Sequence, residues 1–214
     1  MELVLGITGG VGAGKSRILE ILRQEYGARI IQADQVAAVL EEPGEPGLLA
    51  LTELFGTGIL NQEGSLDRKA FAQRIFTDEK ALEMVNQVIH PMTWQRIREM
   101  IAQEPCPVTA VEAALFSEQS RSLCRHLVFV DTSEENRIHR LMEGRGYSRE
   151  KCLDIMKNQP DREYFLQLSD YVIDNNGSLE TVRSQICRMM EEVTNENGKH
   201  CKRKQRKLYL HRFR

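Results

Sequence analysis

The stretch that decides the fold is LVLGITGGVGAGKS, which runs from Leu3 to Ser16. Its first residues, 3–7, form a short continuous apolar run, which is typical of a strand buried on both faces of a parallel sheet. Residues 16–26 then carry apolar side chains at helical spacing, and Gly27 follows as a C-terminal cap. A second short strand is predicted at 29–32. The start of the chain therefore predicts a βαβ unit with a glycine-rich loop before its helix.

The glycine-rich loop, Gly9–Ser16, matches the pattern GxxxxGK[ST] after a strand and before a helix, as the pattern requires. Glycines let such a loop curl until its backbone N–H groups point at phosphate oxygens, and the helix N-terminus adds positive potential. We expect Lys15 to reach the β- and γ-phosphates of ATP and Ser16 to be a ligand of Mg²⁺. A glycine-rich turn that binds nothing is disfavoured, because the strand and the helix are both in place. The expected nucleotide-binding residues are Gly10, Val11, Gly12, Ala13, Gly14, Lys15 and Ser16.

The rest of the chain predicts an α/β fold with three layers and a five-stranded parallel sheet. Three further strands are expected, at 107–112, 127–131 and 171–174. Helices are expected at 34–42, 46–55, 66–76, 79–102, 133–142, 148–158 and 178–193. We expect a break or kink at His90-Pro91 and a glycine-rich break at 143–147.

The expected organisation is one domain, 1–198, followed by a basic tail, 199–214. The helical region at about 34–104 is the candidate binding region for the phosphoryl acceptor, and about 140–160 is the candidate lid. Of the 29 Lys and Arg residues, eight lie in the tail, which leaves 21 against 31 acids and a net charge of −10 for the body. We expect the tail to be disordered and solvated, and we expect no nucleic-acid partner, because no recognition motif accompanies its charge.

The five cysteines are scattered without metal-ligand spacing, and their number is odd. No apolar run approaches the roughly 20 residues of a membrane span. Because residue 1 leads straight into a strand, no signal peptide is expected either. These features predict a cytoplasmic protein with reduced thiols and no membrane contact.

Asp34 follows the second predicted strand, at the sheet edge where ligands of open α/β folds bind. A carboxylate there can orient an attacking hydroxyl or accept its proton. The alternative is that Asp34 only caps the helix that follows, since Asp is a favoured cap.

Arg140, Arg145 and Arg149 surround the predicted glycine-rich break. Guanidinium groups in a phosphoryl-transfer site neutralise charge on the transferring oxygens, and a mobile flap carrying them excludes water. The alternative is a solvated helix face, because Arg137, Arg140 and Glu143 have the spacing of surface pairs.

Several further motifs, taken together, resemble one family. The series is Ala33-Asp34, Phe55-Gly56, Gly64-Ser65-Leu66-Asp67-Arg68, His90-Pro91, Gln159 and Val172-Ile173-Asp174-Asn175-Asn176-Gly177. With the glycine-rich loop, this series resembles the dephospho-coenzyme A kinase family from Gly6 to about Val193. The resemblance implies a P-loop kinase fold of the nucleoside-phosphate-kinase type. It also implies transfer of the γ-phosphoryl group of ATP to the ribose 3′-hydroxyl of dephospho-coenzyme A, the last step of coenzyme A synthesis.

The resemblance assigns roles to individual residues. Asp34 matches the catalytic aspartate, and Arg140 matches a lid arginine, with Arg145 similar in role. Arg68 and His90 fall in the acceptor-side region. Asn175 falls in the nucleotide-side loop. With Lys15, the residues expected to be catalytic are thus Asp34 and Arg140.

Three features depart from the family pattern. Gln32 stands where the family has a first acid, which predicts an altered rate rather than loss of activity. Arg17 replaces a small residue and is expected beside the nucleotide phosphates, where it either clashes or adds charge. The segment 111–116 lacks the common proline, but Glu112 still puts a carboxylate at the strand end, where it could hold the water shell of the metal.

Two other functions stay open at this point. One is a P-loop kinase for another small alcohol, such as a nucleoside, a nucleotide or a shikimate-like compound. The other is a non-catalytic ATP-binding module, an idea that Gln32 and Arg17 favour and that Lys15, Ser16, Asp34 and Arg140 oppose. The sequence does not set the oligomeric state beyond an expectation of a monomer or weak homo-oligomer.

Overall fold

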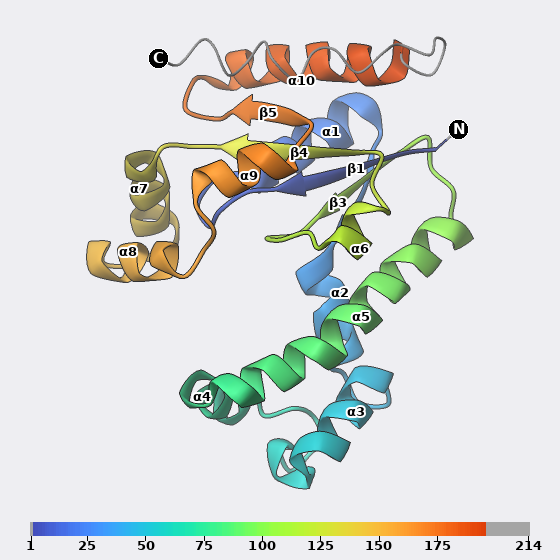
Figure 1. Ribbon diagram of the computed structural model, residues 1–214, viewed down its shortest axis with the longest axis vertical. Helices are drawn as coiled ribbons and strands as arrows, with labels where there is room; N and C mark the ends of the chain where they lie inside the picture. The colour runs from blue at the N-terminus through green and yellow to red at the C-terminus, as the bar shows by residue number, and fades with distance from the viewer. Residues whose placement is uncertain (1, 196–214) are drawn as a thin grey trace.

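The computed structural model describes residues 2–195, and the predicted basic tail 199–214 lies outside them (Figure 1). Five parallel strands form one sheet, as predicted, and their order is β2-β3-β1-β4-β5. The strands are β1 (Leu3–Thr8), β2 (Arg29–Gln32), β3 (Val108–Glu112), β4 (His126–Asp131) and β5 (Tyr171–Asp174). All six residues of β1 are buried, because β1 lies at the centre of the sheet. The apolar run that opens the chain is therefore a central parallel strand.

Helices cover both faces of the sheet. On one face, α1 (Lys15–Tyr26) and α10 (Leu179–Asn195) pack against the sheet, with Ile18, Leu22 and Ile186 fully buried. On the other face, the C-terminal half of α5 (Glu79–Gln103) contributes Ile97 and Ile101 to a second core. The three predicted layers are confirmed. Because the strands are parallel, their carboxyl ends lie at one edge of the sheet, which is the edge where such sheets bind ligands. In Figure 1, β1, β4 and β5 point to the side where α7 (Glu134–Arg145) and α8 (Arg149–Lys157) lie.

The segment between β2 and β3 is helical, as predicted, and forms a lobe beside the sheet (Figure 1). It contains α2 (Ala33–Leu40), α3 (Pro46–Phe55), a 3₁₀ turn (Thr57–Ile59), α4 (Arg68–Thr77) and α5. The lobe has a small core of its own, which includes Leu51, Phe71, Val85 and Ile89. Of the break or kink expected at His90-Pro91, the break is wrong, because α5 continues through Pro91, and the kink stays a prediction. Buried residues on both sides of the proline, Ile89 and Ile97, hold the helix to its neighbours.

The remaining helices follow β3 and β4. They are α6 (Glu118–Arg121), α7 (Glu134–Arg145), α8 (Arg149–Lys157) and α9 (Arg162–Leu168), of which α6 and α9 are too short to show a clear pattern in sequence. Ser133 and Ser148 cap α7 and α8 with their hydroxyl oxygens. The glycine-rich break begins later than predicted: Gly144 and Arg145 belong to α7, and only Gly146 adopts the left-handed conformation that ends it. Within residues 2–195, none of the helices combines the length and the apolar character needed to cross a membrane.

Candidate active site

The glycine-rich loop joins β1 to α1 at the carboxyl edge of the sheet. Gly12 and Gly14 have φ values of 76° and 86°, a conformation that side chains disfavour. In the part of the chain that the structure describes, the backbone N–H groups of Gly12, Gly14, Lys15 and Ser16 have no protein acceptor. Unpaired N–H groups at the start of a helix are suitable donors for phosphate oxygens. The loop is therefore suited to binding the phosphates of a nucleoside triphosphate.

The Lys15 side chain packs against the loop instead of extending into solvent. Its ammonium donates to the carbonyl oxygen of Gly9 at 2.9 Å and is 3.4 Å from Glu112 Oε1. The two charged side chains are only 17% and 11% exposed. The ion pair brings the carboxyl end of β3 to the loop, and it holds the ammonium near the expected phosphates.

Gln32 connects this pair to the second strand. Gln32 and Glu112 are partners in the register of β2 and β3, and Gln32 Nε2 donates to Glu112 Oε2 at 3.2 Å. An aspartate at position 32 would put a second carboxylate beside Glu112, whereas the amide supplies a donor. At the position where the family has an acid, Gln32 therefore gives Glu112 a hydrogen-bond donor.

Asp34 lies in the first turn of α2, two residues after Gln32. Gln32 is the cap residue of α2, and no side chain caps this helix, so the capping alternative for Asp34 is wrong. The Asp34 side chain is exposed, and no hydrogen bond or ion pair joins it to another described residue. Lys15, Glu112, Gln32 and Asp34 thus come together from the carboxyl ends of three neighbouring strands, β1, β3 and β2.

On the other side of the loop, the carbonyl oxygen of Ala13 accepts three hydrogen bonds. The donors are Thr132 Oγ1 at 2.9 Å, Asn175 Nδ2 at 2.8 Å and Arg140 Nη1 at 3.0 Å. Arg140 Nη2 also donates to the carbonyl oxygen of Asn175 at 2.7 Å. Burial, and then the charge of Arg17, lower the pKa of Arg140. Arg140 and the fully buried Asn175 therefore both contact the loop at Ala13.

Arg17 lies in the first turn of α1 with an exposed side chain. Its Nη1 donates to Asn175 Oδ1 at 3.2 Å, so the guanidinium extends toward the loop after β5. The role expected for Arg17 beside the nucleotide phosphates stays a prediction. In this position the side chain contacts Asn175 instead of entering the glycine-rich loop.

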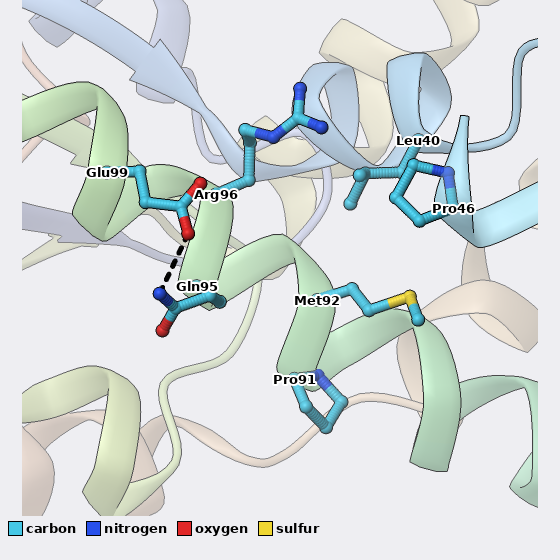
Figure 2. Close-up of a pocket in the computed structure, with 7 residues that line it drawn as sticks. All are labelled: Leu40, Pro46, Pro91, Met92, Gln95, Arg96 and Glu99. Carbon is cyan, nitrogen blue, oxygen red and sulfur yellow. Dashed lines mark hydrogen bonds between the residues drawn. The ribbon is translucent and has the colours of Figure 1, made fainter. Parts of the chain in front are cut away.

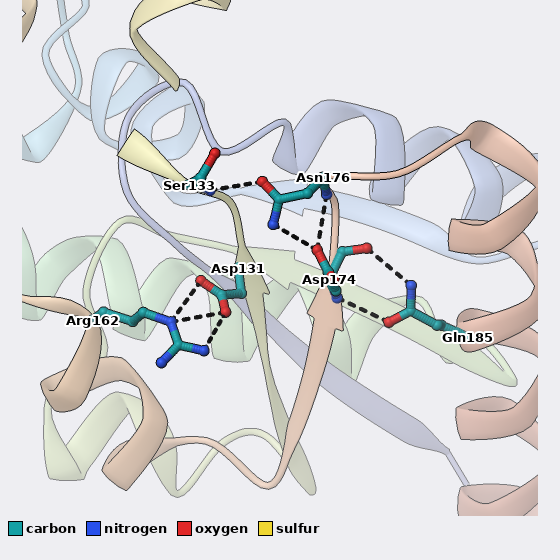
Figure 3. Close-up of polar contacts among 6 residues, drawn as sticks. All are labelled: Asp131, Ser133, Arg162, Asp174, Asn176 and Gln185. Atoms are coloured by element: carbon teal, nitrogen blue, oxygen red, sulfur yellow. Dashed lines mark hydrogen bonds and ion pairs between the residues drawn. The ribbon is translucent and has the colours of Figure 1, made fainter. Parts of the chain in front are cut away.

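Figure 3 shows the polar contacts that hold the loops after β4 and β5 together. Asn176 Oδ1 accepts from the backbone N–H of Ser133 at 2.8 Å, and Asp174 Oδ1 accepts from the backbone N–H of Asn176 at 2.9 Å. Asp131, at the end of β4, accepts two hydrogen bonds from Arg162 Nε and one from Nη2. These contacts fix the segment in which Asn175 reaches Ala13.

The two outer arginines of the predicted lid do not reach the loop. Arg149 forms an exposed ion pair with Glu135, which raises the pKa of Arg149. Arg145 is exposed at the end of α7. The role predicted for Arg145 stays a prediction.

Arg68 and His90 lie on the helical lobe. Arg68 begins α4 and donates to Glu41 Oε2 at 2.9 Å and to the carbonyl oxygen of Ala38 at 3.2 Å, so it is bound to α2. His90 is exposed on α5. Figure 2 shows a hollow of about 360 Å³ on the same lobe. It is lined by Leu40, Pro46, Pro91, Met92, Gln95, Arg96 and Glu99, and neither Arg68 nor His90 is among them.

Sequence reasoning missed one contact of the loop. Arg137, which the spacing on α7 placed on a solvated face, is partly buried against Val11, and Gln159 joins it there. The sequence of α7 does not show that Arg137 contacts the loop, because a residue one turn before Arg140 can lie on a solvated face or on a packed one. Gln159 belongs to the family-like series, but that series assigned it no role.

The chemistry of the available donors fits Mg²⁺. The structure describes no group of three or more His, Cys, Asp or Glu side chains that could hold a metal ion between residues 2 and 195. Mg²⁺ in phosphoryl-transfer sites needs only one or two protein oxygens beside phosphates and waters. The exposed hydroxyl of Ser16 and the carboxylates of Glu112 and Asp34 are oxygen donors of this kind.

Comparisons with known proteins agree with this geometry. The family model described as dephospho-CoA kinase matches residues 3–181. A dephospho-CoA kinase of Corynebacterium glutamicum is 35% identical over 195 residues, covering 89% of this chain and 100% of the relative.

Two solved structures have the same fold. The protein TT1252 from Thermus thermophilus superposes with a TM-score of 0.75 at 28% identity, covering 90% of this chain and 98% of the other. Dephospho-CoA kinase from Campylobacter jejuni gives 0.65 at 24% identity, with coverages of 92% and 100%. A matching family model over most of the chain, together with such a relative, identifies the family. The chain belongs to the dephospho-CoA kinase family.

Proposed function

We propose that this chain transfers the γ-phosphoryl group of ATP to the ribose 3′-hydroxyl of dephospho-CoA. The observation that carries the proposal is the line of contacts from Lys15 through Glu112 to Gln32, with Asp34 two residues further along. It puts a phosphate-binding cation and an unpaired, exposed carboxylate at one edge of the sheet. Phosphoryl transfer depends mainly on such positioning and on electrostatic stabilisation.

In this proposal the glycine-rich loop binds the triphosphate. The free N–H groups of Gly12, Gly14, Lys15 and Ser16 donate to phosphate oxygens, and the Lys15 ammonium neutralises charge that develops on the transferring group. The Lys15 ammonium donates to the carbonyl oxygen of Gly9 and forms an ion pair with Glu112 in the structure. The ammonium is therefore held in place before a nucleotide arrives.

Asp34 is proposed to orient the 3′-hydroxyl of the acceptor and to receive its proton. An exposed carboxylate without a protein partner is available for both tasks. Ser16, with Glu112 nearby, would hold Mg²⁺. A Mg²⁺ ion held there would neutralise part of the charge on the phosphates.

Arg140 is proposed to stabilise charge from behind the loop, through Ala13, and Asn175 to form the nucleotide side of the site with Arg17. Arg145 is proposed to approach from the end of α7. On the acceptor side we propose Arg68 and His90, within the binding region at about 34–104, with about 140–160 as the lid.

The proposed setting is the cytoplasm. The four cysteines among residues 2–195, Cys106, Cys124, Cys152 and Cys187, are free thiols, which suits a reducing compartment. We further propose that the protein works as a monomer or weak homo-oligomer and that dephospho-CoA is its small-molecule partner.

The test is ADP release by the purified protein with Mg²⁺ and ATP, with dephospho-CoA, adenosine or no acceptor added. We expect release only with dephospho-CoA, and coenzyme A as the product in mass spectrometry. Lys15→Ala is the matched control for contaminating kinases. Release with adenosine instead would favour another small-molecule kinase, and ATP binding without turnover on any acceptor would favour the non-catalytic module.

A further inference from the structure

A closed set of hydrogen bonds holds the turn of the glycine-rich loop at Val11. Gln159 Oε1 accepts from the backbone N–H of Val11 at 3.0 Å and from Arg137 Nη2 at 2.8 Å. Arg137 Nε donates to the carbonyl oxygen of Val11 at 2.8 Å. Both backbone groups of Val11 are therefore fixed by two side chains that come from α7 and from the segment after α8.

The packing around this turn is equally close. The guanidinium of Arg137 lies against Gly10, where an added Cβ would be 2.4 Å from Nη2. The Val11 side chain packs against a small apolar cluster between α7 and α8 that includes Ile138, Leu141 and Cys152. The loop and the α7–α8 hairpin are thus in contact through both polar and apolar groups, over a sequence separation of 148 residues between Val11 and Gln159.

One opposite charge, that of Glu134, is near enough to Arg137 to raise its pKa, but its effect is smaller than that of burial. Among the described residues no carboxylate lies within ion-pair distance of its guanidinium, although the side chain is partly buried. Its hydrogen bonds go to neutral oxygens, those of Val11 and Gln159. Burial lowers the pKa of Arg137, but an arginine stays protonated at neutral pH. The positive charge therefore lies against the phosphate-binding loop, at Gly10 and Val11.

We propose that Arg137 and Gln159 are positioning residues that fix the Val11 turn and thereby set the affinity of the loop for the triphosphate of ATP. The pair also ties the α7–α8 hairpin to the loop, so that the two ends of the predicted lid, near 140 and near 160, are held against it. This inference rests on the proposed binding of ATP, but it does not depend on which alcohol accepts the phosphoryl group.

The test uses four single variants and one double variant, and it measures the dissociation constant of ATP with Mg²⁺ by calorimetry. Gln159→Leu removes the shared oxygen, and Gln159→Glu keeps an acceptor for both donors. Arg137→Met removes the charge with little change in length. Gln167→Leu makes the same change on the exposed face of α9 and is the matched control.

We expect Gln159→Leu to weaken ATP binding about tenfold, the effect of leaving buried donors unsatisfied. Gln159→Glu and Gln167→Leu should stay within about threefold of the unchanged protein. Arg137→Met should also lose about tenfold. Because both residues act through Val11, the double variant should lose much less than the hundredfold product of the two single effects.

The Michaelis constant for dephospho-CoA separates positioning of the loop from general damage. It should stay within about twofold in Gln159→Leu and Arg137→Met, while the constant for ATP rises. ATP affinity equal to that of Gln167→Leu in both variants would overturn the inference. If Gln159→Leu does not fold, Arg137→Met against Arg137→Lys decides in the same way, with Lys keeping the charge. Failure of the unchanged protein to bind ATP would instead overturn the proposed function.

Discussion

The sharpest test of the loop geometry compares two glycine-to-alanine changes, Gly12→Ala and Gly27→Ala. Both glycines have positive φ values, 76° and 62°, so an added methyl group meets a similar backbone penalty at each. Their surroundings differ. A Cβ at Gly12 would lie 2.8 Å from the carbonyl oxygen of Arg137 and 3.1 Å from Leu141 Cγ, whereas nothing lies within 4 Å of one at Gly27.

The difference between the two variants follows from these distances. The left-handed conformation costs about 1–2 kcal/mol for alanine, and this is the whole expected effect at Gly27. At Gly12 the contact is with backbone of α7, which cannot rotate away, and overpacking adds roughly 1–3 kcal/mol. For a chain of this length each kcal/mol lowers the melting temperature by about 2–4 °C. We expect Gly12→Ala to melt about 5 °C below Gly27→Ala.

Urea unfolding and calorimetry of ATP binding measure the two consequences together. Gly27→Ala should bind ATP as the unchanged protein does, because Gly27 ends α1 far from the loop. Gly12→Ala should bind at least about tenfold more weakly, since the loop and α7 must separate. Equal stabilities for the two variants, with equal ATP affinity, would show that α7 does not lie against the loop as described.

Three further predictions concern the chemistry, the tail and one buried thiol. Lys15→Ala and Asp34→Asn should each lower turnover at least about a hundredfold in an ADP-release assay, and near-normal turnover of Asp34→Asn would remove it from the mechanism. Deleting 199–214 should leave turnover unchanged, and a large loss would make the tail part of the site. Burial raises the pKa of the Cys124 thiol from 9.0 to about 12. The unfolded chain therefore loses this proton first, so the free energy of unfolding should fall by roughly 1 kcal/mol between pH 8 and 10. Cys124→Ala should remove that part of the decline in urea titrations.

The sequence by itself determined the sheet, the loop and the family. A continuous apolar run before GGVGAGKS is compatible with few structures other than a buried strand followed by a phosphate-binding loop. The five strands lie within one or two residues of their predicted positions. Local patterns suffice there because burial of a strand and curling of a glycine loop depend on neighbouring residues. One exception was His90-Pro91, where α5 does not break and Ile89 and Ile97 are buried on both sides of the proline.

Only the tertiary structure decided which side chains meet. Glu112 reaches Lys15 and Gln32 because β3 lies between β1 and β2, an order that no local pattern specifies. Likewise, Arg137 faces the loop instead of solvent because α7 packs against Gly10 and Val11, far away in sequence. Helical spacing predicts which residues share one face of a helix, but not which element that face packs against. The residues proposed to bind the nucleotide therefore follow from the motif, whereas those that hold the motif in place required the packed chain.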